Sequence, residues 1–100
     1  DTAISQVIRF WGLGEPIYDK PPALPVFTAG ARDVHTAAFA VPIFGAGDKF
    51  MAALTLSGPA SRLSAAHTSG ELDRPQLDAA ADLSRKLGAS VAFCENIYGI

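Results

Sequence analysis

The chain is organised around the stretch from Phe39 to Leu63, which reads FAVPIFGAGDKFMAALTLSGPASRL. Two mostly apolar runs flank the turn Gly45–Asp48, whose length and glycine content are typical of a connection between antiparallel strands. Larger and smaller side chains alternate along both runs, as they do in a strand with one packed face. The stretch therefore predicts a hairpin of two antiparallel strands over residues 36–44 and 49–57.

The two predicted strands should have one face of large side chains and one face of small ones. The face with the large side chains carries Phe39, Val41, Ile43, Phe50, Ala52, Leu54 and Leu56. The small face carries Ala38, Ala40, Pro42, Met51, Ala53, Thr55 and Ser57. Because Pro42 has no backbone N–H to donate, we expect a sheet edge or a bulge at this position. Gly58-Pro59 should end the second strand, so that a new chain direction begins there.

Two helices are expected outside the hairpin. In residues 2–11, apolar side chains recur at the spacing of one helical face, at Ile4, Val7, Ile8 and Trp11. In the C-terminal half, Asp73 is expected to cap a helix over residues 75–87, and Gly88 should end it.

The remaining segments give weaker signals. The Pro-rich segment 15–30 is expected to be a loop with a short extended piece around residues 24–28. A short helical turn through Leu63 should lead into a polar loop over residues 64–72. The pattern of residues 89–100 fits either an extension of the preceding helix or a short strand.

Length and composition limit the class of protein. One hundred residues, about half of them hydrophobic, suit one packed domain of the α+β class. The net charge of −2 and the scattered cations argue against a nucleic-acid-binding surface in this chain. No apolar run approaches the roughly 18–20 residues of a membrane span. Because residue 1 is Asp rather than Met, we expect the chain to be a piece of a longer protein.

Reactive and metal-binding residues are few. A single cysteine, Cys94, allows no disulfide within the chain, which favours a reducing, cytoplasmic compartment. His35, His67 and Cys94 lie in three unrelated segments, so we expect no metal site and no catalytic pair. Ser57 does not stand in a nucleophile elbow, because Thr55 occupies the position of the required glycine. We therefore expect no catalytic residue, no metal and no cofactor.

A candidate binding site lies on the small face of the hairpin. Thr55 and Ser57 are two residues apart on a strand, so their hydroxyl groups should point to the same side. Ala38 and Ala40 would leave space above that side if they paired with them across the hairpin. Such a space suits a carboxylate held by neutral donors, helped by backbone N–H groups after Gly58. The alternative is that both hydroxyl groups face solvent on a half-buried strand.

Three blocks of the sequence resemble a known family. They are AVPIF (residues 40–44) before a Gly-Asp turn, AALTLSGPASRLS (residues 52–64) and LDAAADLSRKLGA (residues 77–89). In this order they resemble the C-terminal effector-binding domain of IclR-type bacterial transcription regulators. The resemblance covers roughly residues 38–90, whereas residues 1–35 match the family poorly.

The resemblance implies a fold and a function. It implies part of a GAF-like effector domain, an antiparallel sheet flanked by helices that senses a small organic acid or aromatic metabolite. The effector-binding positions carried over from the family are Ala38, Ala40, Thr55 and Ser57. It also implies a homodimer or homotetramer that binds DNA only through a winged helix-turn-helix domain absent from this chain. Two other readings stay open: a small hydrolase that uses Ser57, and a dimerisation module without a ligand.

Overall fold

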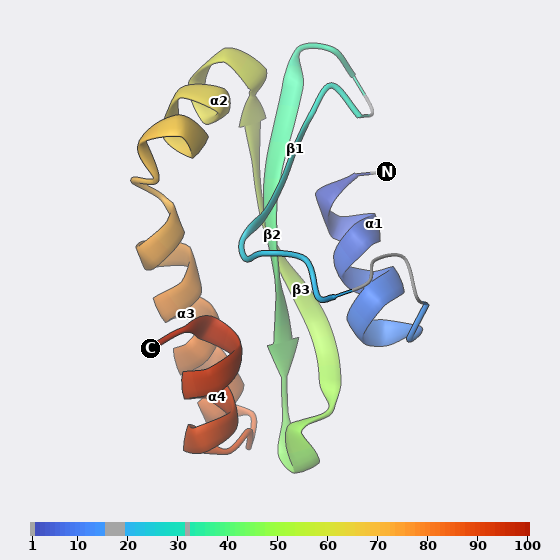
Figure 1. Cartoon of the computed structure of the whole chain (residues 1–100), viewed down its shortest axis with the longest axis vertical. Coiled ribbons are helices and arrows are strands. Elements are labelled where there is room, and N and C mark those ends of the chain that lie inside the picture. The colour runs from blue at the N-terminus through green and yellow to red at the C-terminus, as the bar shows by residue number, and fades with distance from the viewer. Residues whose placement is uncertain (1, 16–19, 32) are drawn as a thin grey trace.

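The architecture is a three-stranded antiparallel sheet with helices on both faces, as Figure 1 shows for a computed structural model of the chain. The structure describes residues 2–15, 20–31 and 33–100. Their elements follow in the order α1 (Ala3–Val7), η1 (Ile8–Gly12), β1 (Val26–Ala29), β2 (Thr36–Phe44), η2 (Ala46–Asp48), β3 (Phe50–Pro59), α2 (Ala60–Ser69), α3 (Asp73–Lys86) and α4 (Val91–Tyr98). The predicted α+β class, with an antiparallel sheet flanked by helices, is confirmed.

The sheet has the strand order β1-β2-β3. The predicted hairpin is present, and the cross-strand pairs run from Thr36 opposite Pro59 to Phe44 opposite Phe50. The register shifts between Ile43 and Phe44, which places a bulge next to Pro42. The expected extended piece near residues 24–28 is β1, which pairs with the first half of β2.

The two faces of the sheet are covered by different helices, with α1 on one side and α2, α3 and α4 on the other (Figure 1). Phe39 packs with Leu63 and Ala66 of α2. Val41 and Ile43 belong to the main core, together with residues of α3 and α4. On the opposite face, Ala40 packs with α1. Both faces of β2 are therefore buried, and burial of each large side chain contributes about 1.5–3 kcal/mol.

Beyond the end of β1, side chains take the place of a neighbouring strand along β2. The hydroxyl group of Tyr98 donates to the carbonyl oxygen of Pro42 at 2.6 Å, and the N–H of Phe44 donates to the Ser84 hydroxyl at 3.0 Å. The β1 pairs stop at Ala40, so no strand of the described ranges pairs with this side of β2 at Pro42. The expectation of a sheet edge or a bulge at Pro42 is met only locally: β2 is the central strand of the sheet, β1 does not extend as far as Pro42, and the register shift lies beyond it, between Ile43 and Phe44.

The hairpin turn is tied to the last helix through one carboxylate. Asp48 has a positive φ of 58°, and its side chain accepts hydrogen bonds from the backbone N–H and the hydroxyl of Ser90. Ser90 is also the N-cap of α4, since its own hydroxyl oxygen accepts a hydrogen bond from the N–H of Phe93. The C-terminal tail, for which the sequence allowed a helix or a strand, is this helix.

Two expectations about residues 57–72 are wrong. The second strand does not end at Ser57, because Gly58 and Pro59 still pair with Ala37 and Thr36. Residues 64–69 are not a polar loop: α2 runs from Ala60 to Ser69, because Leu63 and Ala66 are buried against the sheet. Gly70, in the left-handed conformation, ends this helix.

The predicted helix bounds also need correction. The helix expected over residues 2–11 has α-helical winding only over Ala3–Val7 and wider π-type winding over Ile8–Gly12. The helix expected over residues 75–87 is α3, which begins at Asp73, after Leu72 at the N-cap position. Gly88 follows it with a φ of 106°, as the stop signal predicted.

The glycine that ends η1 has a packing role. A Cβ atom at Gly12 would lie 3.0 Å from the ring of Phe50, so this position accepts no side chain without movement of the ring. This close approach lets η1 pack against β3. None of the helices in the described ranges combines the length and the apolar character that crossing a lipid bilayer requires.

Candidate functional site

The four residues predicted to bind an effector share one face of the sheet. The register places Ala38 opposite Ser57 and Ala40 opposite Thr55, so the four side chains form two adjacent cross-strand rows. On the other side of β2, Ala38 is opposite Thr28. The predicted pairing of small residues with hydroxyl-bearing residues is therefore present in the structure.

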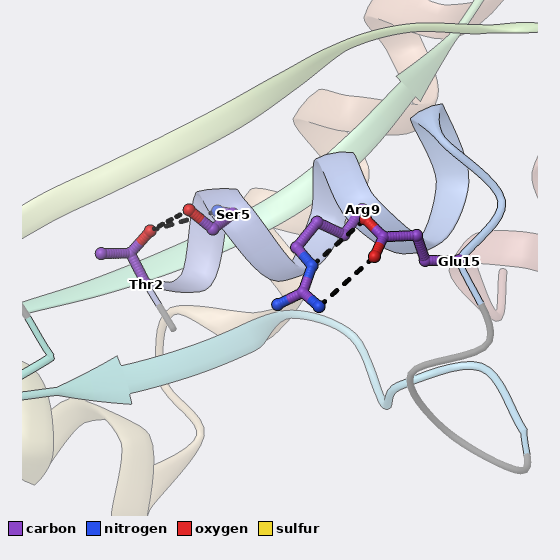
Figure 2. Close-up of polar contacts among 4 residues, drawn as sticks. All are labelled: Thr2, Ser5, Arg9 and Glu15. Carbon is purple, nitrogen blue, oxygen red and sulfur yellow. Dashed lines mark hydrogen bonds and ion pairs between the residues drawn. The ribbon is translucent and has the colours of Figure 1, made fainter.

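The helix segment α1–η1 covers this face and is held at both ends (Figure 2). At its start, the Thr2 side chain caps α1 by accepting a hydrogen bond from the N–H of Ser5. Towards its end, the guanidinium group of Arg9 pairs with both carboxylate oxygens of Glu15, at 3.3 and 3.4 Å. The segment is joined to the sheet by the N–H of Ala3, which donates to the Thr28 hydroxyl at 2.9 Å.

A small hollow of about 90 Å³ lies between the start of α1 and the sheet. Three of the four predicted residues, Ala38, Thr55 and Ser57, line it. The fourth, Ala40, does not, because it is completely buried against Ala3 and Val7 of α1. The other lining residues are Thr2, Ile4, Thr28, Ala31, Thr36 and Ala37.

The hydroxyl groups of Thr55 and Ser57 have different environments. The Oγ1 atom of Thr55 is buried and has no hydrogen-bond partner within the described residues. Ser57 is exposed to solvent. Burying a hydroxyl group without a partner costs about 1–3 kcal/mol, so the Thr55 hydroxyl would gain most from a bound polar group.

The lining of the hollow is polar and uncharged within the described residues. Five of the nine described lining residues carry a hydroxyl group, and none of these nine carries a charge. Two of the five, Thr2 and Thr28, already hold α1 in place. The site can therefore offer neutral hydrogen-bond donors to a small anion or to a neutral polar ligand.

The first backbone donor after Gly58, the N–H of Ala60, is not free. The N–H of Ala60 donates to the carbonyl oxygen of His35 at 2.8 Å, which continues the β2–β3 ladder by one pair. Gly58 itself pairs with Ala37 inside the ladder. A ligand would thus depend on side-chain hydroxyl groups rather than on these amides.

Sequence reasoning missed the contribution of Thr2, Thr28 and Thr36. Thr28 and Thr36 belong to the β1–β2 pair, and Thr2 lies at the start of α1. Their hydroxyl-bearing side chains are visible in the sequence, but nothing local shows that β1 pairs with β2 or that α1 lies over this face. Only the long-range packing brings them beside Ser57.

The titratable residues considered as catalytic candidates lie apart from the hollow. His67 belongs to α2, not to a polar loop as expected, and its ring stacks on Phe27 with 4.2 Å between centroids. Cys94 is buried in the main core, and burial raises the pKa of its thiol group. None of these side chains lines the hollow, and within the described ranges no hydrogen bond joins Ser57 to a base. Nor do those ranges contain three metal-ligating side chains placed to share an ion.

Two other hollows are larger. One of about 420 Å³ lies between η1, the Pro21–Leu24 segment and the end of α4. One of about 280 Å³ lies beside β3 and the start of α3. We place the candidate site in the smaller hollow, because its lining is rich in hydroxyl groups and the Thr55 side chain, whose buried Oγ1 atom has no partner within the described residues, lies on that face of the sheet. The hollow beside β3 has a mostly apolar lining, although the buried Oε1 atom of Gln76, which lines it, also has no partner within the described residues.

Comparisons with family models, with curated proteins and with solved structures each find no match to this chain.

Proposed function

We propose that this chain is the ligand-sensing part of a bacterial transcription regulator and that its effector is a small carboxylate. The observation that carries the proposal is the buried Thr55 hydroxyl, which lacks a partner beside a hollow lined by Ala38 and Ser57. The resemblance of residues 38–90 to IclR-type effector domains, which are GAF-like, agrees with this site. In this proposal the longer protein acts in the cytoplasm as a homodimer or homotetramer, and a separate winged helix-turn-helix domain binds DNA.

The volume of the hollow favours a small effector over an aromatic one. An apolar cavity of about 150 Å³ is enough to hold benzene, whereas most ligand pockets have about 300–1,000 Å³. The hollow here has about 90 Å³. An aromatic acid would have to displace the start of α1, while a short-chain acid such as acetate or lactate requires no such movement.

The hydroxyl-rich lining favours a polar ligand that accepts hydrogen bonds. A buried carboxylate is costly unless several donors satisfy it. The hydroxyl groups of Thr36, Thr55 and Ser57 have no side-chain hydrogen bond within the described part of the chain, so each can donate. A hydroxy acid would in addition donate its own hydroxyl group to one of these oxygens.

The position of α1 suggests how occupancy could be sensed. The hollow is formed by Thr2 and Ile4 on one side and by the sheet on the other. A ligand that contacts both sides binds the state with α1 docked more tightly than the state with α1 displaced. Differential affinity of this kind is what shifts a two-state equilibrium and changes the relation between subunits.

Thermal and urea unfolding with added carboxylates tests the proposal. Sodium acetate, lactate and benzoate would be compared with sodium chloride at equal ionic strength. At a concentration of about 100 times its dissociation constant, a specific ligand adds about 2.7 kcal/mol to the free energy of unfolding. We expect a saturable increase with acetate or lactate and a smaller effect of benzoate.

A matched pair of variants locates the effect. Ala38→Leu places a larger side chain in the hollow and should abolish the increase, whereas Ala52→Leu changes an exposed alanine of β3 and should keep it. The proposal fails if no carboxylate stabilises the chain more than chloride does, or if Ala38→Leu responds as fully as the unmodified protein.

The same samples address the two other readings. A hydrolase that uses Ser57 should gain the mass of a serine-directed fluorophosphonate probe at that residue. A dimerisation module without a ligand should show self-association and no response to any carboxylate. We favour the sensor over both, because neither alternative accounts for a buried hydroxyl group beside a polar hollow.

A further inference from the structure

The outer edge of β3 is a row of backbone groups without a strand partner among the described residues. In the order β1-β2-β3, the described strands give β3 a hydrogen-bonded neighbour on one side only. The bond from the Ala60 N–H to the His35 carbonyl oxygen fixes which residues of β3 face β2. Hydrogen-bonded pairs alternate along an antiparallel ladder, so the backbone groups of Ala53, Thr55 and Ser57 point outward.

The features that usually protect such an edge are missing from the middle of β3. Natural sheets block edge pairing with charged side chains, prolines, bulges or very short edge strands. β3 has ten residues, and the sequence carries no charged side chain between Phe50 and Ser61. The register shift lies at one end of the strand and Pro59 at the other, so Ala53 to Gly58 is uninterrupted.

An apolar hollow follows the same edge. It has a volume of about 280 Å³ and is lined by Leu54, Thr55, Leu56, Leu72, Pro75 and Gln76. The Leu56 side chain is 42% exposed. An occupant of this edge must therefore supply backbone hydrogen bonds to β3 and apolar side chains to the hollow, a combination that only a strand provides.

We propose that the occupant is β3 of a second copy of this chain, paired in an antiparallel manner about a two-fold axis at Thr55. The pairing places Thr55 opposite Thr55, Ala53 opposite Ser57 and Leu54 opposite Leu56. The two sheets then form one continuous six-stranded sheet. The backbone groups that meet across the axis are those that point outward in each copy.

The chemistry of β3 favours its own copy over another strand. Self-pairing brings no charge against a like charge, because the strand has none. It places leucine beside leucine on the face of the hollow and threonine beside threonine on the other face, and both are favourable cross-strand pairs. A two-fold axis also closes the assembly as a dimer, because it pairs the same surface of both subunits.

This inference does not depend on the carboxylate site. The proposed ligand contacts side chains on the α1 face, whereas the dimer is held mainly by outward backbone groups and by leucine side chains on the opposite face. Thr55 is the one side chain that both use. Absence of ligand binding would leave the edge as it is, and absence of self-association would leave the hollow as it is. The two experiments can therefore fail separately.

Sedimentation equilibrium of the 100-residue chain with two matched variants tests the interface. Leu56→Lys places a charge at the edge, and Leu83→Lys makes the same change on α3 at a leucine that is 41% exposed. We expect Leu56→Lys to raise the dimer dissociation constant by at least about tenfold, because an apolar side chain that is buried in the interface is lost. Leu83→Lys, which lies outside the interface, should change the dissociation constant by no more than about twofold.

Amide hydrogen exchange of the unmodified chain gives a second readout that requires no variant to fold. Protection of the amides of Ala53, Thr55 and Ser57 should rise with protein concentration. Protection of Leu54 and Leu56, whose amides already face β2, should not change. This alternation would identify the edge itself rather than a neighbouring face.

Four outcomes would overturn the inference. The first is a chain that stays monomeric from micromolar to millimolar concentration, and the second is a dimer that Leu56→Lys does not weaken and that shows no alternating amide protection. The third is growth of open-ended aggregates in place of a dimer. The fourth is binding of an unrelated apolar peptide at the β3 edge by a chain that does not self-associate.

Discussion

The hydroxyl group of Tyr98 donates a hydrogen bond to the carbonyl oxygen of Pro42, with 2.6 Å between the two oxygens. Because this uses the only hydroxyl hydrogen of Tyr98, Ser84 must donate to the Tyr98 oxygen, 2.8 Å away. Ser84 in turn accepts from the N–H of Phe44 at 3.0 Å. A chain of three hydrogen bonds thus closes the part of β2 that β1 does not reach.

Tyr98→Phe removes the middle of this chain. The buried carbonyl oxygen of Pro42 then loses its donor, and the Ser84 hydroxyl loses its acceptor. We expect the free energy of unfolding to fall by about 1–3 kcal/mol, as it does when a buried polar group is left without a partner. Urea unfolding followed by circular dichroism measures this change.

The control for that variant is a double-mutant cycle with Ser84→Ala. Because the two residues share one network, the losses in the single variants should sum to more than the loss in the double variant. Strictly additive losses would show that the two hydroxyl groups act independently and would contradict the hydrogen-bond chain.

Alkaline pH should destabilise the fold through the same tyrosine. Burial raises the pKa of Tyr98 to about 12, although the hydrogen bond from Ser84 opposes this. In the unfolded chain the pKa is about 10, so above that pH the unfolded state releases a proton that the folded state keeps. This contribution is therefore complete below pH 10 and is lost as the pH rises to about 12.

Urea midpoints measured from neutral pH to about pH 11 would show this loss as a steady decline. Tyr98→Phe should have a shallower decline over the same range. Contributions from all other groups are common to both proteins and cancel in the comparison. Equal slopes for the two proteins would mean that the Tyr98 hydroxyl ionises as easily in the folded state as in the unfolded one.

The hairpin could be predicted from the sequence because its signals are local. Alternation along β2 and β3 shows that Ala38 and Ala40 share a face with Thr55 and Ser57, and the structure contains this arrangement. The exact register could not be read from the turn, because the pairing shifts between Ile43 and Phe44. The packing of α1 over this face could not be predicted, because the hydrogen bond between Ala3 and Thr28 that holds it there joins residues 25 positions apart in the sequence.

The predictions for residues 57–72 were wrong because tertiary contacts in this segment outweigh the secondary structure that its local sequence favours. The polar residues 64–69 have little helical pattern, but burial of Leu63 and Ala66 supports a helix there. The sequence predicts that Gly58-Pro59 ends the strand at Ser57, whereas β3 continues for two more residues, to Pro59. Pro59 lies opposite Thr36 in a pair whose backbone groups point away from each other, so its missing N–H costs no ladder hydrogen bond.

Substitutions at Asp48 test how the hairpin turn holds α4. Asp48→Ala removes both hydrogen bonds to Ser90 and keeps a Cβ atom at a φ of 58°, so we expect a loss of about 2–3 kcal/mol. Asp48→Gly removes the same bonds but relieves the strain, and it should cost about 1 kcal/mol less than alanine. Thermal unfolding of both variants, with Asp48→Asn as the conservative control, measures the order of their stabilities. Equal stability of the alanine and glycine variants would contradict a left-handed conformation at this position.

Thr55→Val tests whether the Thr55 hydroxyl group binds a ligand or has only a structural role in the fold. Valine has the shape of threonine without the hydroxyl group, and the Thr55 hydroxyl is buried without a partner. Without ligand, the variant should therefore be more stable than the unmodified chain, by about 1 kcal/mol. With acetate or lactate the order should reverse, because the unmodified chain gains a hydrogen bond to the ligand that valine cannot make. Urea unfolding with and without the carboxylate measures both effects, and Ser61→Ala, which removes an exposed hydroxyl group outside the described lining of the hollow, is the control. A destabilised Thr55→Val variant that still responds to ligand would show that the hydroxyl group is satisfied within the protein, and the proposed site would lose its main support.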